Sequence, residues 1–301
     1  MWQSILNDIK KGNYKVLARA ISLVENEVAG YEELLEQLPQ STTPIIGITG
    51  PPGAGKSTLV DAMIAHWVKL DKKIAVLCVD PSSPFNLGAL LGDRIRMNEW
   101  YTHPNVYIRS LATRGSLGGL HPHIIEITSL LQASVFDYII VETVGVGQSE
   151  IVIAGLADTT VVVVVPEAGD EIQTMKAGLM EIADIFVINK SDRPDADRFV
   201  RNLRLMLSNG NKYGKETAVL KTVASLRVGI EELCNAIEVS KTNTTINNKK
   251  IWLLTERVFR LIQRKKMHGI QKEFIKKIIL EQYQKEGFNL FTLAQKIYNE
   301  S

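Results

Sequence analysis

The sequence contains little cysteine and no long apolar segment. Only two cysteines occur among 301 residues, Cys78 in an apolar strand-like run and Cys234 on an apolar helix face. Free cysteines in such surroundings are usually buried small hydrophobes, so we expect no disulfide. The longest dense apolar run, 161–165, is stopped by Pro166 and is far shorter than the roughly 20 residues that cross a bilayer. We therefore expect no membrane partner.

A secretion signal and a strongly charged surface are also missing. The chain starts Met-Trp-Gln-Ser-Ile-Leu-Asn-Asp, without the basic stretch, apolar core and small-residue cleavage site of a signal peptide. With 35 basic and 33 acidic side chains the formal net charge is +2, and 45% of the residues are hydrophobic. This balance argues against disorder and against a strongly basic nucleic-acid surface. We expect a cytoplasmic globular protein that does not bind nucleic acid.

The order of apolar patterns divides the chain into three parts. Residues 1–42 carry apolar positions at helical spacing and form an N-terminal helical segment. Residues 43–240 alternate short Val/Ile runs with helical stretches, which is typical of a parallel sheet covered by helices on both faces. Residues 241–301 begin with a polar linker and continue as a basic, amphipathic helical arm. The arm either packs onto its own core or forms a dimer seam or partner-docking face.

Seven strands are expected in the middle part, and polar motifs follow several of them. The predicted strands are 45–49, 74–79, 106–108, 138–142, 160–165, 185–189 and 218–221. In open α/β sheets, ligands bind in the crevice outside the carboxyl ends of the strands. The motifs therefore stand where a ligand site is expected.

A glycine-rich loop follows the first predicted strand and opens a helix. Its backbone N–H groups can surround phosphates at the helix N-terminus. Lys56 is expected against the β and γ phosphates, and Ser57 is expected to give its hydroxyl to Mg²⁺. The expected nucleotide-binding residues of this loop are Gly50, Pro51, Pro52, Gly53, Ala54, Gly55, Lys56, Ser57 and Thr58. The fold class predicted is α/β, a P-loop NTPase G domain with N-terminal and C-terminal helical extensions.

The nature of the base is indicated by a second motif, Asn189-Lys190-Ser191-Asp192, at the end of another predicted strand. A carboxylate at Asp192 can accept from N1–H and N2–H₂ of guanine, donors that adenine does not present together. The motif therefore predicts GTP and GDP rather than adenine nucleotides. An Asp192 that only caps a helix is the alternative interpretation.

Acidic residues end two further predicted strands. Glu142 can hold Mg²⁺ through water, and the amide of Gly145 can sense the γ-phosphate. Asp80 is a further water-mediated ligand, unless it only initiates an Asp-Pro turn. Asp93 and Arg114 lie in loops that can reach the nucleotide or can be solvated surface charges. We assign Lys56, Glu142, Gly145 and Asp93 to catalysis, and Ser57, Asp80 and Glu142 to Mg²⁺.

The glutamine that many small GTPases place directly after the glycine of this switch is absent. Val146 occupies that position, and Gln148 lies further on. Intrinsic GTP hydrolysis is therefore expected to be slow. A slow rate makes sense if a partner completes the catalytic site, because positioning and electrostatic stabilisation supply most of this catalysis.

Four segments go beyond a generic GTPase pattern. They are Val-Asp-Pro-Ser-Ser at 79–83, Leu-Gly-Asp-Arg at 91–94, Arg-Gly-Ser-Leu-Gly-Gly at 114–119 and Glu-Thr-Val-Gly-Val-Gly-Gln-Ser-Glu at 142–150. In these segments the chain resembles the methylmalonyl-CoA mutase-associated GTPases, collinearly over roughly residues 19–232. Residues 166–176 look like the extra nucleotide-responsive loop of that family, in which the roles of Asp170, Gln173 and Lys176 stay open.

The resemblance implies a metallochaperone-like G protein. Such a protein assists cobalamin loading, protection or reactivation of methylmalonyl-CoA mutase or a related acyl-CoA mutase. The resemblance also implies a homodimer in which the helical arm contributes to the interface. No mutase or cobalamin-binding segment is evident in the sequence, so we expect the client to be a separate protein.

The loop behind the guanine departs from the family pattern. Ala224, Ser225 and Leu226 stand where the family usually has Ser-Ala-Leu, and the segment that follows is shortened. The family resemblance assigns this loop to nucleotide binding. A contact through backbone N–H would survive the change of side chains.

Three other classes of protein share parts of this pattern. A nickel-enzyme maturation GTPase should carry a His-rich or Cys-based site, whereas the five histidines include only the pair His121-Pro-His123, without a ligand cluster. A transport-linked ATPase or kinase is opposed by Asp192, which favours guanine. An RNA-binding targeting GTPase is disfavoured because the C-terminal region is not Met-rich and has no clear RNA-binding motif.

Overall fold

The computed structural model describes most of the chain. The residues described are 2–80, 97–113, 120–143, 149–168, 180, 182–210, 217–242, 248–267, 272–283 and 288–300. They form two compact units, Met1–Lys250 and Ile251–Ser301.

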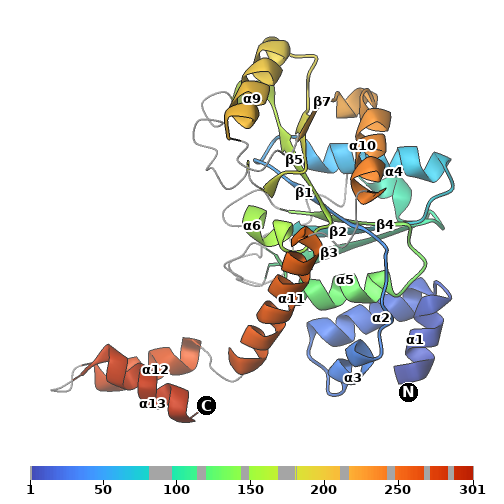
Figure 1. Cartoon of the computed structure of the whole chain (residues 1–301). Coiled ribbons are helices and arrows are strands. Elements are labelled where there is room, and N and C mark those ends of the chain that lie inside the picture. Colours follow the sequence, from blue (N-terminus) through green and yellow to red (C-terminus); the bar gives the residue numbers. More distant parts are fainter. Residues whose placement is uncertain are drawn as a thin grey trace. The chain divides into compact units, whose positions relative to one another are not determined.

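A seven-stranded sheet is the centre of the first unit (Figure 1). The strands are β1 (Ile45–Thr49), β2 (Ile74–Asp80), β3 (Val106–Ala112), β4 (Tyr138–Glu142), β5 (Thr159–Val164), β6 (Ile185–Ile188) and β7 (Ala218–Lys221). Their order is β3-β2-β4-β1-β5-β6-β7, and all neighbours are parallel. All seven predicted strands are confirmed. Only β3 runs well past its predicted end, because Arg109 and Ser110 interrupt its apolar run.

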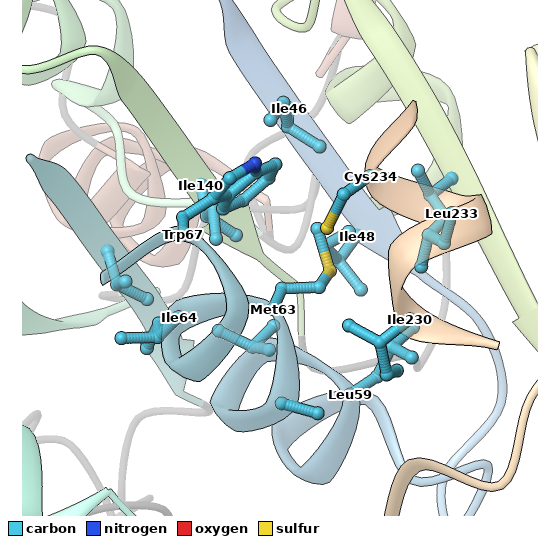
Figure 2. Packing of buried hydrophobic residues seen from close by; sticks show 14 of the residues in the cluster. Ile46, Ile48, Leu59, Met63, Ile64, Trp67, Ile140, Ile230, Leu233 and Cys234 are labelled. Atoms are coloured by element: carbon cyan, nitrogen blue, oxygen red, sulfur yellow. The ribbon is translucent and has the colours of Figure 1, made fainter. Parts of the chain in front are cut away.

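One face of the sheet is covered by α4 (Lys56–Lys69) and α10 (Ile230–Thr242). Successive strand residues point to opposite faces, so Ile46 and Ile48 of β1 pack here while Ile45 does not. Figure 2 shows Met63 and Trp67 of α4 directed into the same space as Cys234 of α10. The indole of Trp67 stacks on Tyr138 with ring centroids 4.3 Å apart. Both cysteines are free and buried, as the sequence predicts.

The opposite face is covered by α5 (Ile124–Gln132), α6 (Ser149–Ala154), α9 (Ala196–Gly210) and the N-terminal helices. The N-terminal helices are α1 (Trp2–Lys10), α2 (Tyr14–Glu25) and α3 (Tyr31–Glu36). Ile45, Leu77 and Val141 belong to the apolar cluster that the N-terminal helices share with α5. This arrangement confirms the predicted α/β class with a sheet covered on both faces.

An aspartate precedes three of the strands and fixes the amino edge of the sheet. Asp137, Asp158 and Asp184 stand directly before β4, β5 and β6. Their carboxylates accept backbone N–H groups of Lys73, Ile45 and Thr160, each at 2.8 Å. Each bond joins a strand start to the neighbouring strand. These side-chain bonds therefore fix neighbouring strand starts to one another at the amino edge of the sheet.

The second unit is helical and shows much apolar surface. It contains most of α11 (Asn248–Met267), together with α12 (Lys272–Gln282) and α13 (Leu290–Glu300). Leu293 and Ile297 are its buried hydrophobic side chains among the residues described. Among the described side chains of α11, seven large apolar ones are between 46% and 60% exposed: Ile251, Trp252, Leu254, Val258, Phe259, Ile262 and Met267. Within the described parts of the chain, no helix is long and apolar enough to span a bilayer.

Candidate nucleotide-binding site

The glycine-rich loop leaves β1 at the carboxyl edge of the sheet and enters α4. Strand β1 lies between β4 and β5, so the chain passes to one side of it for β2 to β4 and to the other for β5 to β7. Ligands of open α/β sheets bind at such a switch point. At Gly50, φ is 143° and a Cβ would lie 2.0 Å from the carbonyl oxygen of Val163. Only glycine lets the chain leave β1 so close to β5.

Lys56 begins α4 and is folded back against the loop. Its buried Nζ donates to the carbonyl oxygens of Gly50 at 2.9 Å and Pro51 at 3.1 Å. The N-terminus of a helix carries a partial positive charge and free N–H groups. The ammonium and the helix end are therefore close together, an arrangement that favours a polyphosphate.

Ser57, on the first turn of α4, contacts the last residue of β4. Its Oγ donates to Oε1 of Glu142 at 2.7 Å, and both residues are buried. Mg²⁺ binds hard oxygen ligands and usually uses only one or two carboxylates. The hydroxyl and the carboxylate together fit this ion, because they bring two such oxygens to the loop that opens α4.

Asn189 connects the glycine-rich loop with the segment after β7. Its Nδ2 donates to the carbonyl oxygen of Ala54 at 2.9 Å. Its Oδ1 accepts from Oγ1 of Thr222 and from the backbone N–H of Ala224, both at 3.1 Å. Next to it Lys190, with a positive φ of 56°, donates from Nζ to the carbonyl oxygen of Gly53 at 2.8 Å. These bonds fix the spacing between the two predicted nucleotide motifs.

The other residues that the sequence predicts to bind guanine are exposed. Asp192 lies in the turn after β6 and is exposed. The short helix η4 (Ala224–Leu226) starts at the N–H bonded to Asn189, and its Ser225 and Leu226 are exposed, the latter by 69%. An exposed carboxylate and an exposed loop beside the phosphate loop can bind a base.

The loop residues not yet placed differ in burial, and several predicted residues lie outside the part described. Ala54 is buried, Pro51 and Thr58 are half-buried, and Pro52 and Gly53 are exposed. The backbone of Asp80 ends β2 beside Ala112, but its side chain lies outside the described atoms. The following residues that the sequence analysis singled out lie outside the described ranges: Asp93, Arg114, Gly145, Val146, Gln148, Asp170, Gln173 and Lys176.

Two contacts near the guanine motif were not predicted. Thr222 is fully buried and holds the amide of Asn189, and its only sequence signal is a polar residue directly after an apolar strand. Arg193, after Asp192, pairs with Glu167 of the short helix η3 (Pro166–Ala168). The hydrogen bond from Arg193 holds the pKa of the Glu167 carboxyl below its ordinary value. No local pattern indicates this pair, because its members are far apart in the sequence.

Comparisons with known proteins agree with this geometry. The family described as "Methylmalonyl Co-A mutase-associated GTPase MeaB" matches residues 17–277. A putative GTPase of Pyrococcus abyssi is 49% identical over 244 residues, which cover 79% of this chain and 75% of that protein. The mouse protein named methylmalonic aciduria type A homolog, mitochondrial, is 39% identical over 198 residues, covering 60% and 48%.

A solved structure has the same fold over nearly the whole length. It is described as the crystal structure of an LAO/AO transport system kinase. The TM-score is 0.72 at 27% identity, with 99% of this chain and 96% of that chain covered. The family match and the assembled loop together establish GTP binding and hydrolysis. The chain belongs to the methylmalonyl-CoA mutase-associated GTPase family.

Proposed function

We propose that this protein is a GTP-driven chaperone of a cobalamin-dependent acyl-CoA mutase, in which GTP hydrolysis accompanies cobalamin loading, protection or reactivation. The observation that carries the proposal is the family match over residues 17–277, because the family is described by its association with methylmalonyl-CoA mutase. The client is methylmalonyl-CoA mutase or a related acyl-CoA mutase. The phosphate loop, with its buried Lys56 and Ser57, supplies the nucleotide chemistry that such a cycle needs.

In the proposed reaction Lys56 binds the β and γ phosphates. Its ammonium already makes two hydrogen bonds to carbonyl oxygens of the loop, and phosphate oxygens replace them as stronger, charged acceptors. Ser57 and Glu142 would hold Mg²⁺, which would neutralise charge that develops on the phosphates. Glu142 is the last residue of β4, so the sheet rather than a loop positions its carboxylate.

Guanine specificity is assigned to Asp192. Its exposed carboxylate accepts from N1–H and N2–H₂ of the base. Asn189 stays bonded to Ala54 and Ala224 and sets the distance from the base to the phosphates. Hydrogen bonds therefore connect the segment that carries Asp192 to the phosphate loop.

Hydrolysis by the isolated protein is proposed to be slow. Val146 replaces the glutamine that positions water in many small GTPases. A partner that positions the water or adds a cation would raise the rate, since these two effects supply most phosphoryl-transfer catalysis. GTP turnover then reports engagement of the client.

The test is GTP turnover by the purified protein with and without methylmalonyl-CoA mutase from the same organism. A Lys56→Ala variant excludes contaminating hydrolysis, and an unrelated acyl-CoA enzyme serves as a protein control. A rate raised by the mutase and not by the control enzyme supports the chaperone function. A rate that the mutase leaves unchanged leaves the GTPase in place and rejects this mutase as the client.

We further propose that the protein is a homodimer with the C-terminal unit in the interface. The apolar side chains of α11 that are about half exposed support it, since a run of this kind is usually covered by a partner. A second copy is the partner that the family resemblance implies.

A further inference from the structure

Two buried threonines join the ends of β1 and β4. Oγ1 of Thr143 donates to Oγ1 of Thr49 at 2.9 Å, and the two residues are 1% and 0% exposed. The backbone N–H of Thr143 also donates to the carbonyl oxygen of Ile48 at 3.0 Å. Thr49 directly precedes Gly50, and Thr143 directly follows Glu142. The hydroxyl pair therefore joins the residue that precedes the phosphate loop to the residue that follows the proposed Mg²⁺ ligand.

The two side-chain bonds at these strand ends lie on opposite faces of the sheet. Along β4, Tyr138 and Ile140 face α4, whereas Ile139 and Val141 face the N-terminal helices and α5. Strand alternation places Glu142 on the α4 side, where it meets Ser57, and Thr143 on the other side. One bond thus holds the end of β4 from each face.

The hydroxyl bond begins where the strand pairing ends. The register of β1 and β4 runs from Ile45 with Ile139 to Ile48 with Glu142. Beyond Glu142, the bonds from Thr143 are the next ones that fix β4 to β1. Buried hydroxyls need a hydrogen-bond partner, and here the two threonine hydroxyls bond to each other. The pair therefore sets both the distance and the orientation of the two strand ends.

We propose that Thr49 and Thr143 are positioning residues for the Mg²⁺-holding pair, Ser57 and Glu142. The inference rests on the magnesium role in the proposed function. Loss of the hydroxyl bond lets the end of β4 twist about its last backbone bond. The Glu142 carboxylate then leaves the place where Ser57 meets it, although neither threonine touches the ion or the nucleotide.

The experiment measures GDP affinity in excess Mg²⁺ and in EDTA for the wild type, Thr143→Val and Thr143→Ser. In Thr143→Val we expect EDTA affinity within about twofold of the wild type, since the phosphate loop is intact. The affinity gained on adding Mg²⁺ should fall roughly tenfold, as for outer partners of other metal ligands. Thr143→Ser keeps the hydroxyl and should restore the gain.

Two further variants separate positioning from loss of fold. The double variant Thr49→Val/Thr143→Val removes both hydroxyls, so neither stays buried without its partner. Its gain of GDP affinity on adding Mg²⁺ should be reduced as much as that of Thr143→Val. Thr128→Val is the matched control, because Thr128 is a buried threonine of α5 whose hydroxyl donates within its own helix, to the carbonyl oxygens of Ile124 and Ile125. It should keep the full Mg²⁺ gain.

The outcomes are distinct. If the GDP affinity of the wild type is the same in Mg²⁺ and in EDTA, the magnesium assignment is overturned, and this inference with it. A wild type that gains affinity, together with a Thr143→Val variant that keeps the whole gain, overturns the inference alone. Equal losses in EDTA and in Mg²⁺, or a loss of the gain in Thr128→Val as well, also overturn it, because they indicate general damage.

Discussion

Two polar residues of the guanine motif have opposite surroundings. Asn189 is buried, and its amide makes three hydrogen bonds within the protein. Asp192 is exposed. Asn189 therefore joins the glycine-rich loop to the segment after β7, and Asp192 is the residue proposed to bind the base. This division decides which substitution changes specificity and which one disrupts the site.

The Asp192→Asn variant is predicted to exchange guanine for xanthine. Replacing the carboxylate by an amide removes a charged acceptor for N1–H and N2–H₂ of guanine. It also introduces a donor for the xanthine oxygen. GTP affinity should fall roughly 10–100-fold, because a hydrogen bond to a charged group contributes about 1.5–3 kcal/mol. Competition of xanthosine triphosphate and GTP against a fluorescent nucleotide measures this. Asp195→Asn, at an exposed aspartate just beyond the motif, should change neither affinity; GTP binding unaffected by Asp192→Asn contradicts the assignment.

The thiol of Cys234 is predicted to be unreactive in the folded protein. Its burial is also predicted to make the protein less stable as the pH becomes alkaline. Burial raises the pKa of its thiol to about 12. The thiolate is the form that attacks thiol reagents, so Cys234 in the native protein at pH 8 should react slowly, and both cysteines should react once the protein is denatured. The unfolded thiol ionises near pH 8.5. Stability from this group is thus complete below that pH and is lost as pH rises toward 12. Urea midpoints at pH 8 and 10.5 should differ more in the wild type than in Cys234→Ala.

At the scale of the elements, the connection from β1 into the glycine-rich loop allows only glycine at its first position. In Gly50→Ala the new Cβ would meet the Val163 carbonyl at 2.0 Å, so the loop or β5 must move. We expect loss of nucleotide binding in a titration, with a lowered melting temperature. For stability Gly53→Ala is the matched control: φ is also positive, 77°, but no protein atom lies within 4 Å of its Cβ. Its free energy of unfolding should fall only by the ~1–2 kcal/mol of left-handed backbone. Equal losses of unfolding free energy in the two variants would reject the steric argument.

The sequence predicts the strands well because a buried parallel strand is a short, nearly continuous apolar run. It predicts the motifs because each follows such a run directly. Long-range polar contacts leave no comparable pattern. Arg109, inside β3, pairs with Glu25 of α2 and donates to Ser22 at 3.0 Å, and nothing local in the sequence connects these residues. The threonine pair was missed for the same reason, since its members are joined only by the pairing of β1 with β4.

Arg109 is predicted to fasten the N-terminal helices to the sheet. It is 21% exposed and Glu25 12% exposed, so Arg109→Met removes the guanidinium from a mostly buried carboxylate, which keeps Nε2 of His121 at 4.0 Å. The free energy of unfolding should fall by roughly 2–3 kcal/mol, less than the ~3–5 kcal/mol of a fully buried pair, because water still reaches the arginine. Urea unfolding measures the loss. The double variant Arg109→Met/Glu25→Leu should recover part of it; no recovery would mean that the arginine acts by packing alone.

At the scale of the whole molecule, the two units differ in how many large apolar side chains they expose. The first unit encloses three apolar clusters around its sheet. The second is short, is helical and leaves many large apolar side chains exposed. The sequence indicates an amphipathic arm but not what covers it, because periodicity shows which face is apolar and not which surface it meets. A nucleotide site built in one unit and a proposed interface in the other can be tested separately.

An acidic residue on the apolar face of α11 is predicted to break the proposed dimer without affecting nucleotide binding. Ile251, Leu254, Val258 and Ile262 recur every three or four residues and form that face. Ile262→Glu would bury a charge in an interface, a cost that exposed sites do not carry. Arg260→Glu places the same side chain on the other face and disturbs a partly exposed pair with Glu256, a kind of pair that contributes little. Light scattering should find a wild-type and Arg260→Glu dimer and an Ile262→Glu monomer, all with the same GDP affinity. A monomeric wild type, or a dimeric Ile262→Glu variant, would remove α11 from the interface, and a changed GDP affinity would show that the two units are coupled.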